Sequence, residues 1–245
     1  MSAVLYGSIS TIAKPPLNTI NPILLSSLTY LIIGIVLTLI LKITKEDGKV
    51  TLDSLKLIFI TSVCGAVIGP ILFFYGLKMT HASISSLLVN AEFLFSIILA
   101  VIILKEKPKD RASYIGIVLL FASLIILNFK IDDNKSYVFF HYDNLVGNML
   151  IIGATIFWAI DNNISKIILQ KGTPIIKIIQ IKSLIGGLIS FFIVLVSGIT
   201  FAINLYQIPG LLLLSLGGFG GSLFLFLKGM KKIGTIKSVM IFFNI

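Results

Sequence analysis

Long apolar segments dominate this sequence, and they constrain its fold more than any other feature. Seven of them are long enough to cross a bilayer, at residues 23–41, 57–77, 82–104, 113–129, 147–165, 175–198 and 208–227. Two shorter pieces, 3–13 and 235–245, are predicted to be partial spans. A crossing helix needs roughly 20 apolar residues, about twice the length of a barrel strand. Because backbone polar groups in lipid must be satisfied internally, we expect an all-α integral membrane protein.

The composition argues against a soluble domain. The chain is 57% hydrophobic and 12% charged, whereas soluble domains carry about 25% charged residues. The net charge of +10 would suit nucleic acid, but the basic residues flank apolar spans, where membrane topology explains them. A single cysteine, Cys64, excludes an internal disulfide and a cysteine-based zinc cluster. We therefore expect no nucleic-acid partner, no metal and no cofactor.

The basic residues are distributed unequally between the two sides of the predicted membrane. Of the 20 lysines and arginines, 15 fall in alternate connections, at positions 42, 45, 49, 56, 105, 107, 109, 111, 166, 171, 177, 228, 231, 232 and 237. The other connections hold four, at positions 14, 78, 130 and 135, and Lys182 lies inside a span. Since cytoplasmic loops are enriched in Lys and Arg, the bias predicts a cytoplasmic N-terminus.

The sequence also matches itself at an offset of 152 residues. The matched pairs are Lys14 with Lys166, Pro22 with Pro174, Gly34 with Gly186, Gly65 with Gly217, Gly69 with Gly221, and Tyr6 with Trp158. A unit of five spans is odd in number, so a second copy would enter the membrane from the opposite side, as in inverted-repeat transporters. We predict a first repeat at 1–129, a linker at 130–144 and a second repeat at 145–245.

The same offset predicts that the ten-helix architecture is cut short at both ends. The first span is clipped, the ninth is incomplete and the tenth is missing, because the counterpart of residue 129 would fall beyond Ile245. A non-transporting remnant of a transporter is therefore one alternative. A membrane-embedded enzyme is another, but His and acidic residues outside the spans are dispersed rather than clustered as such chemistry requires.

One carboxylate interrupts the apolar segment 82–104. Glu92 is the eleventh of these 23 residues and their only ionisable one. A charge at mid-bilayer costs about 2.5–3.5 kcal/mol on insertion scales, so it persists when it faces a cavity or a partner. Lys182, the other charge deep in a span, is the expected partner, and Asp161 is expected nearer the cytoplasmic end of its helix. Glu92 is a candidate proton carrier; an ion pair that only holds helices together is the alternative.

The run from Gly76 to Glu92, followed by Leu104-Lys-Glu106, resembles EamA-type proteins of the drug/metabolite transporter superfamily. It is similar to the end of their third span, their fourth span and the loop that follows. One branch of the family has an Asn-x-Glu in this helix and a Glu just after it, which Asn90, Glu92 and Glu106 match.

The resemblance continues in the second half of the chain. The same branch has a Trp-x-x-Asp-Asn-Asn sequence, matched from Trp158 to Asn163, and a Lys followed by small residues, matched by Lys182, Gly186 and Gly187. It implies ten helices and transport of small metabolites such as amino acids or drugs, with export the expected direction. The buried Glu92 makes protons the expected coupling ion. The candidates for substrate or proton binding are Glu92, Lys182, Asn90, Asp161, Asn162, Trp158 and Tyr30.

Glycines at corresponding places of the two predicted halves form a second set of candidates. Gly65, Gly69 and Pro70 correspond to Gly217 and Gly221. Interrupted spans at such places point to a central site in transporters, and small residues also allow close helix packing. We expect these residues to form cavity walls. The expected partners are a small-molecule substrate, the lipid bilayer and protons, in a prokaryotic cytoplasmic membrane. The oligomeric state stays open, a homodimer being one option.

Overall fold

The computed structural model describes residues 2–44, 48–106, 114–115, 118–119, 122, 130–131, 137–138 and 145–243. Within these residues, six helical segments are long and apolar enough to cross a membrane: Pro22–Thr44, Leu52–Met79, Ala82–Ile103, Leu145–Gln170, Ile175–Val196 and Leu205–Ile233. They correspond to six of the seven full spans predicted from the sequence. Most of the seventh, 113–129, and most of the predicted linker at 130–144 lie outside the described residues. The all-α membrane fold is confirmed.

Three spans are single helices: α3 (Pro22–Thr44), α9 (Leu145–Gln170) and α10 (Ile175–Val196). Asn21 caps α3, because its side-chain oxygen accepts a hydrogen bond from the backbone N–H of Ile23 at 2.9 Å. A side-chain acceptor at this position satisfies one of the donors that a helix start leaves unpaired.

The other three spans are interrupted. One runs through α4 (Leu52–Thr61), the π-helical η2 (Ser62–Ile68) and α5 (Gly69–Met79). A second runs through η4 (Leu205–Gln207), α11 (Ile208–Leu212), the π-helical η5 (Leu213–Gly221) and α12 (Ser222–Ile233). The third consists of α6 (Ala82–Leu88) and α7 (Ala91–Ile103), which part at Val89 and Asn90. π-helical turns inside α-helices are frequent at functional sites.

Short elements lie at both ends of the chain. The N-terminal residues form α1 (Ser2–Gly7), α2 (Ile9–Ala13) and the 3₁₀ turn η1 (Pro16–Asn18), and the last described helix is α13 (Thr235–Phe243). They correspond to the two partial spans expected from the sequence. Two strands of two residues each, β1 (Lys130–Ile131) and β2 (Tyr137–Val138), pair antiparallel.

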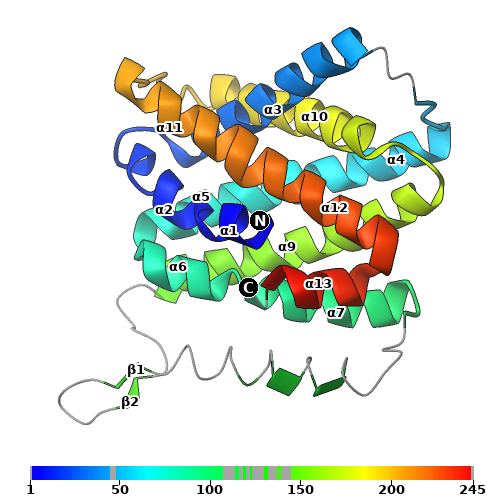
Figure 1. Ribbon diagram of the computed structural model, residues 1–245. Helices are drawn as coiled ribbons and strands as arrows, with labels where there is room; N and C mark the ends of the chain where they lie inside the picture. Colours follow the sequence, from blue (N-terminus) through cyan, green and yellow to red (C-terminus); the bar gives the residue numbers. More distant parts are fainter. Residues whose placement is uncertain are drawn as a thin grey trace.

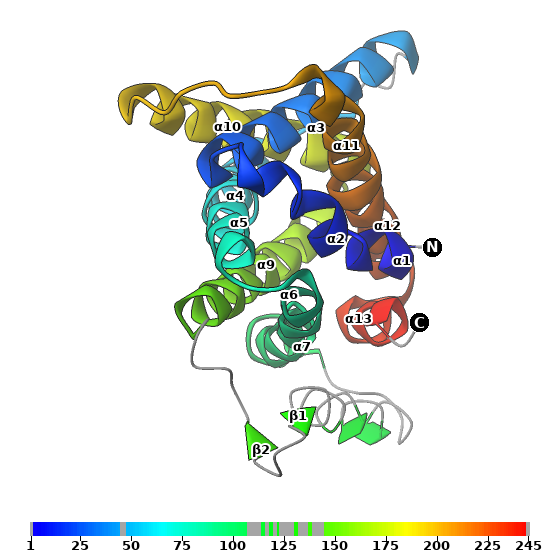
Figure 2. The same cartoon turned by 90° about the vertical axis from the view of Figure 1, so that its left-hand side faces the viewer.

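The helices form a bundle in which segments from both halves of the sequence alternate (Figures 1 and 2). α3 packs along α10, and both α5 and α7 pack along α9. Helix α1 contacts α12 and α13, so the two ends of the described chain lie close together beside α12 (Figure 2).

Glycines allow α3 and α10 to approach closely. A Cβ on Gly34 would lie 2.7 Å from the side chain of Leu184, and one on Gly187 would lie 2.8 Å from the backbone nitrogen of Leu31. The hydroxyl of Ser27 donates to the carbonyl of Gly187 at 3.1 Å. Small residues of this kind bring membrane helices into backbone contact.

Polar contacts gather the connections between spans into two groups. In one group, the Thr173 hydroxyl, between α9 and α10, donates to Ser54 Oγ at the start of α4 at 3.1 Å. In the other, Lys14 Nζ donates to the carbonyl of Thr80 at 2.6 Å, and the Thr80 hydroxyl donates to Asn148 at 3.0 Å. This grouping agrees with the alternation predicted from the sequence. Which group faces the cytoplasm stays a prediction.

Candidate functional site

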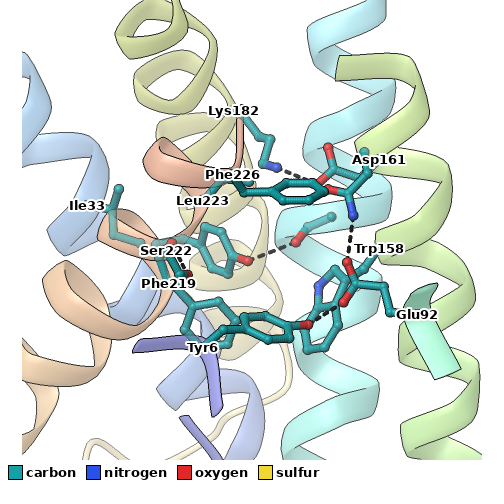
Figure 3. A pocket seen from close by; sticks show the side chains of 13 residues that line it. Tyr6, Ile33, Glu92, Trp158, Asp161, Lys182, Phe219, Ser222, Leu223 and Phe226 are labelled. Carbon is teal, nitrogen blue, oxygen red and sulfur yellow. Dashed lines mark hydrogen bonds and ion pairs between the residues drawn. The ribbon is translucent and has the colours of Figure 1, made fainter. Parts of the chain in front are cut away.

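A cavity lies where the middles of the spans meet (Figure 3). The empty space between its walls is about 530 Å³, including the part that opens outward. Its walls come from α1, α3, η2, α7, α9, α10, η5 and α12. The lining residues are Tyr6, Tyr30, Ile33, Gly65, Glu92, Trp158, Asp161, Asn162, Lys182, Phe219, Ser222, Leu223 and Phe226.

An ion pair between Asp161 and Lys182 forms one side of the cavity (Figure 3). Lys182 Nζ lies 2.5 Å from Asp161 Oδ2, and the two side chains are 2% and 4% exposed, the lysine first. The hydroxyl of Ser165 donates to the other carboxylate oxygen of Asp161 at 3.2 Å. The two charges therefore cancel each other inside the protein.

Lys182 pairs with Asp161 and not with Glu92, the partner predicted from the sequence. Asp161 precedes the end of α9 by nine residues, and Lys182 follows the start of α10 by seven. Because the two helices are consecutive and antiparallel and a helix rises 1.5 Å per residue, the two side chains lie at nearly the same depth. Asp161 lies nearer the α9 end that joins α10 than the other end; whether that end is cytoplasmic stays a prediction.

Glu92 has neutral partners instead. Its side chain is buried, with the residue 6% exposed. One carboxylate oxygen accepts a hydrogen bond from the Asn162 amide at 2.6 Å, and the other accepts one from the Tyr6 hydroxyl (Figure 3). Both donors are uncharged, so the carboxylate is hydrogen-bonded in the cavity wall without a cation of the described residues bound to it.

Aromatic rings line much of the rest of the cavity. The Trp158 ring meets those of Tyr6 and Phe219 edge-on, with centroids 6.2 and 6.1 Å apart. The rings of Tyr30 and Phe219 are 5.8 Å apart, and the Tyr30 hydroxyl donates to the Gly65 carbonyl at 2.9 Å. These are the spacings and tilts that aromatic pairs favour. The cavity thus combines aromatic rings with two carboxyl groups and one amine.

Comparison with known proteins decides the family. The model of the EamA-like transporter family matches residues 1–129, more than half of the chain. The chain belongs to the EamA-like transporter family. This places it in the drug/metabolite transporter superfamily that the sequence resembled.

Two further similarities agree with this assignment. The EamA-like chain is 27% identical over 247 residues to an uncharacterized transporter of Methanothermobacter thermautotrophicus, covering 96% of this chain and 71% of that protein. A crystal structure of a protein 13% identical in sequence matches with a TM-score of 0.72 over 99% of this chain and 81% of that one; at this identity it shows the fold alone. The EamA-like protein is a multi-pass integral membrane transporter.

Most of the predicted site residues of this EamA-like protein line the cavity. They are Glu92, Lys182, Asp161, Asn162, Trp158 and Tyr30, together with Gly65 from the predicted cavity-wall set. Asn90 does not line it: this half-buried residue stands at the N-cap position of α7, at the break before Glu92, and its side chain makes no capping hydrogen bond there. Whether the lining residues bind a substrate or protons stays a prediction.

The remaining glycines of the predicted set do not line the cavity. A Cβ on Gly69 would lie 2.6 Å from Trp158 Nε1, so Gly69 lets the Trp158 ring sit against η2 and α5. Pro70 is buried in the first turn of α5. Gly217 and Gly221 are less crowded, since the nearest atoms to an added Cβ are 3.4 and 3.0 Å away and belong to their own helix.

Six lining residues of the EamA-like protein were not among the candidates taken from the sequence. They are Tyr6, Ile33, Phe219, Ser222, Leu223 and Phe226. The last four follow the spacing i, i+3, i+4, i+7, which marks one face of a helix. Tyr6 matches Trp158 at the 152-residue offset. Because Trp158 was a candidate, this match could have made Tyr6 a candidate as well.

Proposed function

We propose that this transporter carries small molecules through the central cavity and that Glu92 takes up and releases the protons that drive transport. The observation that carries the proposal is the position of Glu92, a 6% exposed carboxylate in a cavity wall at the middle of a span. Ionisable groups buried in membrane spans usually mark substrate paths or proton relays.

We also propose that the chain consists of two inverted repeats, at 1–129 and 145–245, joined by the linker 130–144. Two matched contacts support it. Lys14 Nζ donates to the Lys78 carbonyl at 3.2 Å, and Lys166 Nζ donates to the Met230 carbonyl at 2.5 Å. Lys166 follows Lys14 by 152 positions, and Met230 follows Lys78 by the same 152 positions.

The π-helical segments give a third match. η2 spans Ser62–Ile68 and η5 spans Leu213–Gly221, so that η2 shifted by 152 residues falls inside η5. Each segment contributes a residue to the cavity wall, Gly65 and Phe219. Rocking of one repeat against the other around a site at their interface is the common mechanism of alternating access.

We propose that the N-terminus is cytoplasmic, that the protein lies in a prokaryotic cytoplasmic membrane, and that it exports its substrate. The Lys and Arg bias supports the orientation, and the resemblance to EamA-type proteins implies export. Amino acids and drug-like compounds are the substrate range that this resemblance implies.

Reconstitution of the full chain in liposomes tests the proposal. Solid-supported membrane recording of amino acids and amines, with and without an imposed proton gradient, should give currents that grow with the gradient. Glu92→Gln should abolish the response to the gradient, whereas the exposed Asp53→Asn should not change it. If the wild-type flux does not change with the proton gradient, proton coupling is contradicted. If no tested compound gives a flux, transport by this protein is contradicted.

A further inference from the structure

We propose that the cavity selects small organic cations over neutral molecules and zwitterions, with Glu92 as their counter-ion. This inference rests on the proposed function, because it takes the cavity to be the place where the transported molecule binds. It narrows the substrate range implied by the resemblance to the cationic drug-like compounds and disfavours the zwitterionic amino acids.

The charge balance of the cavity carries the inference. Among the described lining residues, the acidic and basic side chains that can carry a charge near neutral pH are those of Glu92, Asp161 and Lys182. The contact of 2.5 Å between Lys182 and Asp161 pairs two of the three. The hydrogen-bond donors to Glu92 are neutral. An ionised Glu92 therefore leaves one negative charge without a cation bound to it in the wall. Such a buried charge is neutralised either by a proton or by a cation, so a cationic substrate can take the place of the proton.

The same balance disfavours a substrate that carries a carboxylate. Such a group needs a cationic partner in a desolvated site. Lys182 is the one ammonium among the described lining residues, and Asp161 already holds it at 2.5 Å. A zwitterion or an anion would have to break this pair and would also lie near the Glu92 carboxylate.

The aromatic wall indicates which kind of cation fits. The Tyr6 ring carries the hydroxyl that donates to Glu92 and meets the Trp158 ring edge-on, so aromatic groups stand directly beside the carboxylate (Figure 3). Ring faces attract cations, above all alkylated ammonium groups. Ile33 and Leu223 add apolar surface. A substituted ammonium with apolar groups on nitrogen matches this wall better than a strongly hydrated primary ammonium.

Three probes with nearly the same shape test the charge preference. Choline is a cation, 3,3-dimethylbutan-1-ol is its neutral counterpart, and glycine betaine is the zwitterion with the same trimethylammonium group. Trp158 is the single tryptophan of the chain and lines the cavity, so its fluorescence reports occupancy in the purified full chain. We expect choline to bind at least about tenfold more tightly than either other probe, which corresponds to about 1.4 kcal/mol. Equal or tighter binding of the alcohol or of betaine, or no binding of choline, would overturn the proposal.

Glu92→Gln tests the counter-ion. The glutamine amide offers one acceptor and one donor, and the Tyr6 hydroxyl can act as either, so the variant retains the wall while losing the charge. Choline affinity should fall by about tenfold or more, and the affinity for 3,3-dimethylbutan-1-ol should change by less than about twofold. Asp53→Asn, which removes an exposed carboxylate at the start of α4, is the control. If Glu92→Gln does not fold, the comparison of probes on the wild-type protein still decides the question.

Choline counterflow in liposomes separates the two proposals. Binding of choline without counterflow would overturn transport through the cavity and leave the cation preference standing. Counterflow of a neutral or zwitterionic compound by a protein that does not bind choline would overturn the cation preference and leave transport standing.

Discussion

The ion pair of Asp161 and Lys182 allows the sharpest test of the described geometry. The proposed perturbations are Lys182→Met, Asp161→Asn and the double replacement. The two side chains are 2% and 4% exposed with their charged atoms 2.5 Å apart, so water screens the pair little. At an effective dielectric constant of about 20, two unit charges at this distance attract by about 7 kcal/mol before desolvation is counted.

Desolvation opposes most of that attraction, which makes the net effect of the pair small and the effect of breaking it large. Removing one partner of a buried pair typically destabilises by about 3–5 kcal/mol, whereas replacing both with neutral groups is often nearly neutral. We therefore expect each single replacement to lower the free energy of unfolding by about 3–5 kcal/mol. The double replacement should cost less than either, with a coupling energy of at least about 2 kcal/mol.

The assay is unfolding of the detergent-solubilised full chain by SDS, followed by the fluorescence of Trp158. Lys49→Met, at an exposed position, is the matched control and should have little effect. The reasoning would be refuted if each single replacement lowered the free energy of unfolding by less than about 1 kcal/mol. It would also be refuted if the double replacement lowered it by as much as the two single replacements together. A larger coupling between Lys182 and Glu92 than between Lys182 and Asp161 would show that the pairing predicted from the sequence holds in solution.

Two further predictions use matched pairs of positions. Gly65→Ala should lower the free energy of unfolding by about 1–3 kcal/mol, seen as a lower melting temperature in detergent, because its Cβ would overlap the Asp161 carboxylate. Gly217→Ala should leave the melting temperature unchanged, since the atom nearest to its Cβ is a leucine methyl at 3.4 Å. Equal effects at both positions would contradict the packing. In a Cys64→Ala background, a cysteine at the exposed Thr200 should react with an impermeant thiol reagent in intact cells and one at the exposed Lys49 should not; the reverse pattern would invert the proposed topology.

The sequence by itself determined the membrane-spanning helices and the burial of the charges within them. Apolar length is a local property, and lipid leaves a backbone of that length little choice but a helix. All six spans of the described residues were predicted for this reason. The burial of Glu92 and Lys182 was predictable on the same grounds, because a charge inside a span is stable only where the protein surrounds it.

Only the tertiary structure decided which groups meet. Lys182 pairs with Asp161 because consecutive antiparallel helices bring both to one depth, and Glu92 meets Tyr6 from a short N-terminal helix that lies 86 positions away in the chain. Asn90, two residues from Glu92, stands at the start of α7 and does not line the cavity. The apolar pattern of a membrane helix sets where it crosses the bilayer but not how it is rotated about its axis, since lipid and protein interior are both apolar. Rotation and depth together set the contacts of each polar side chain, and these follow from packing against the other helices.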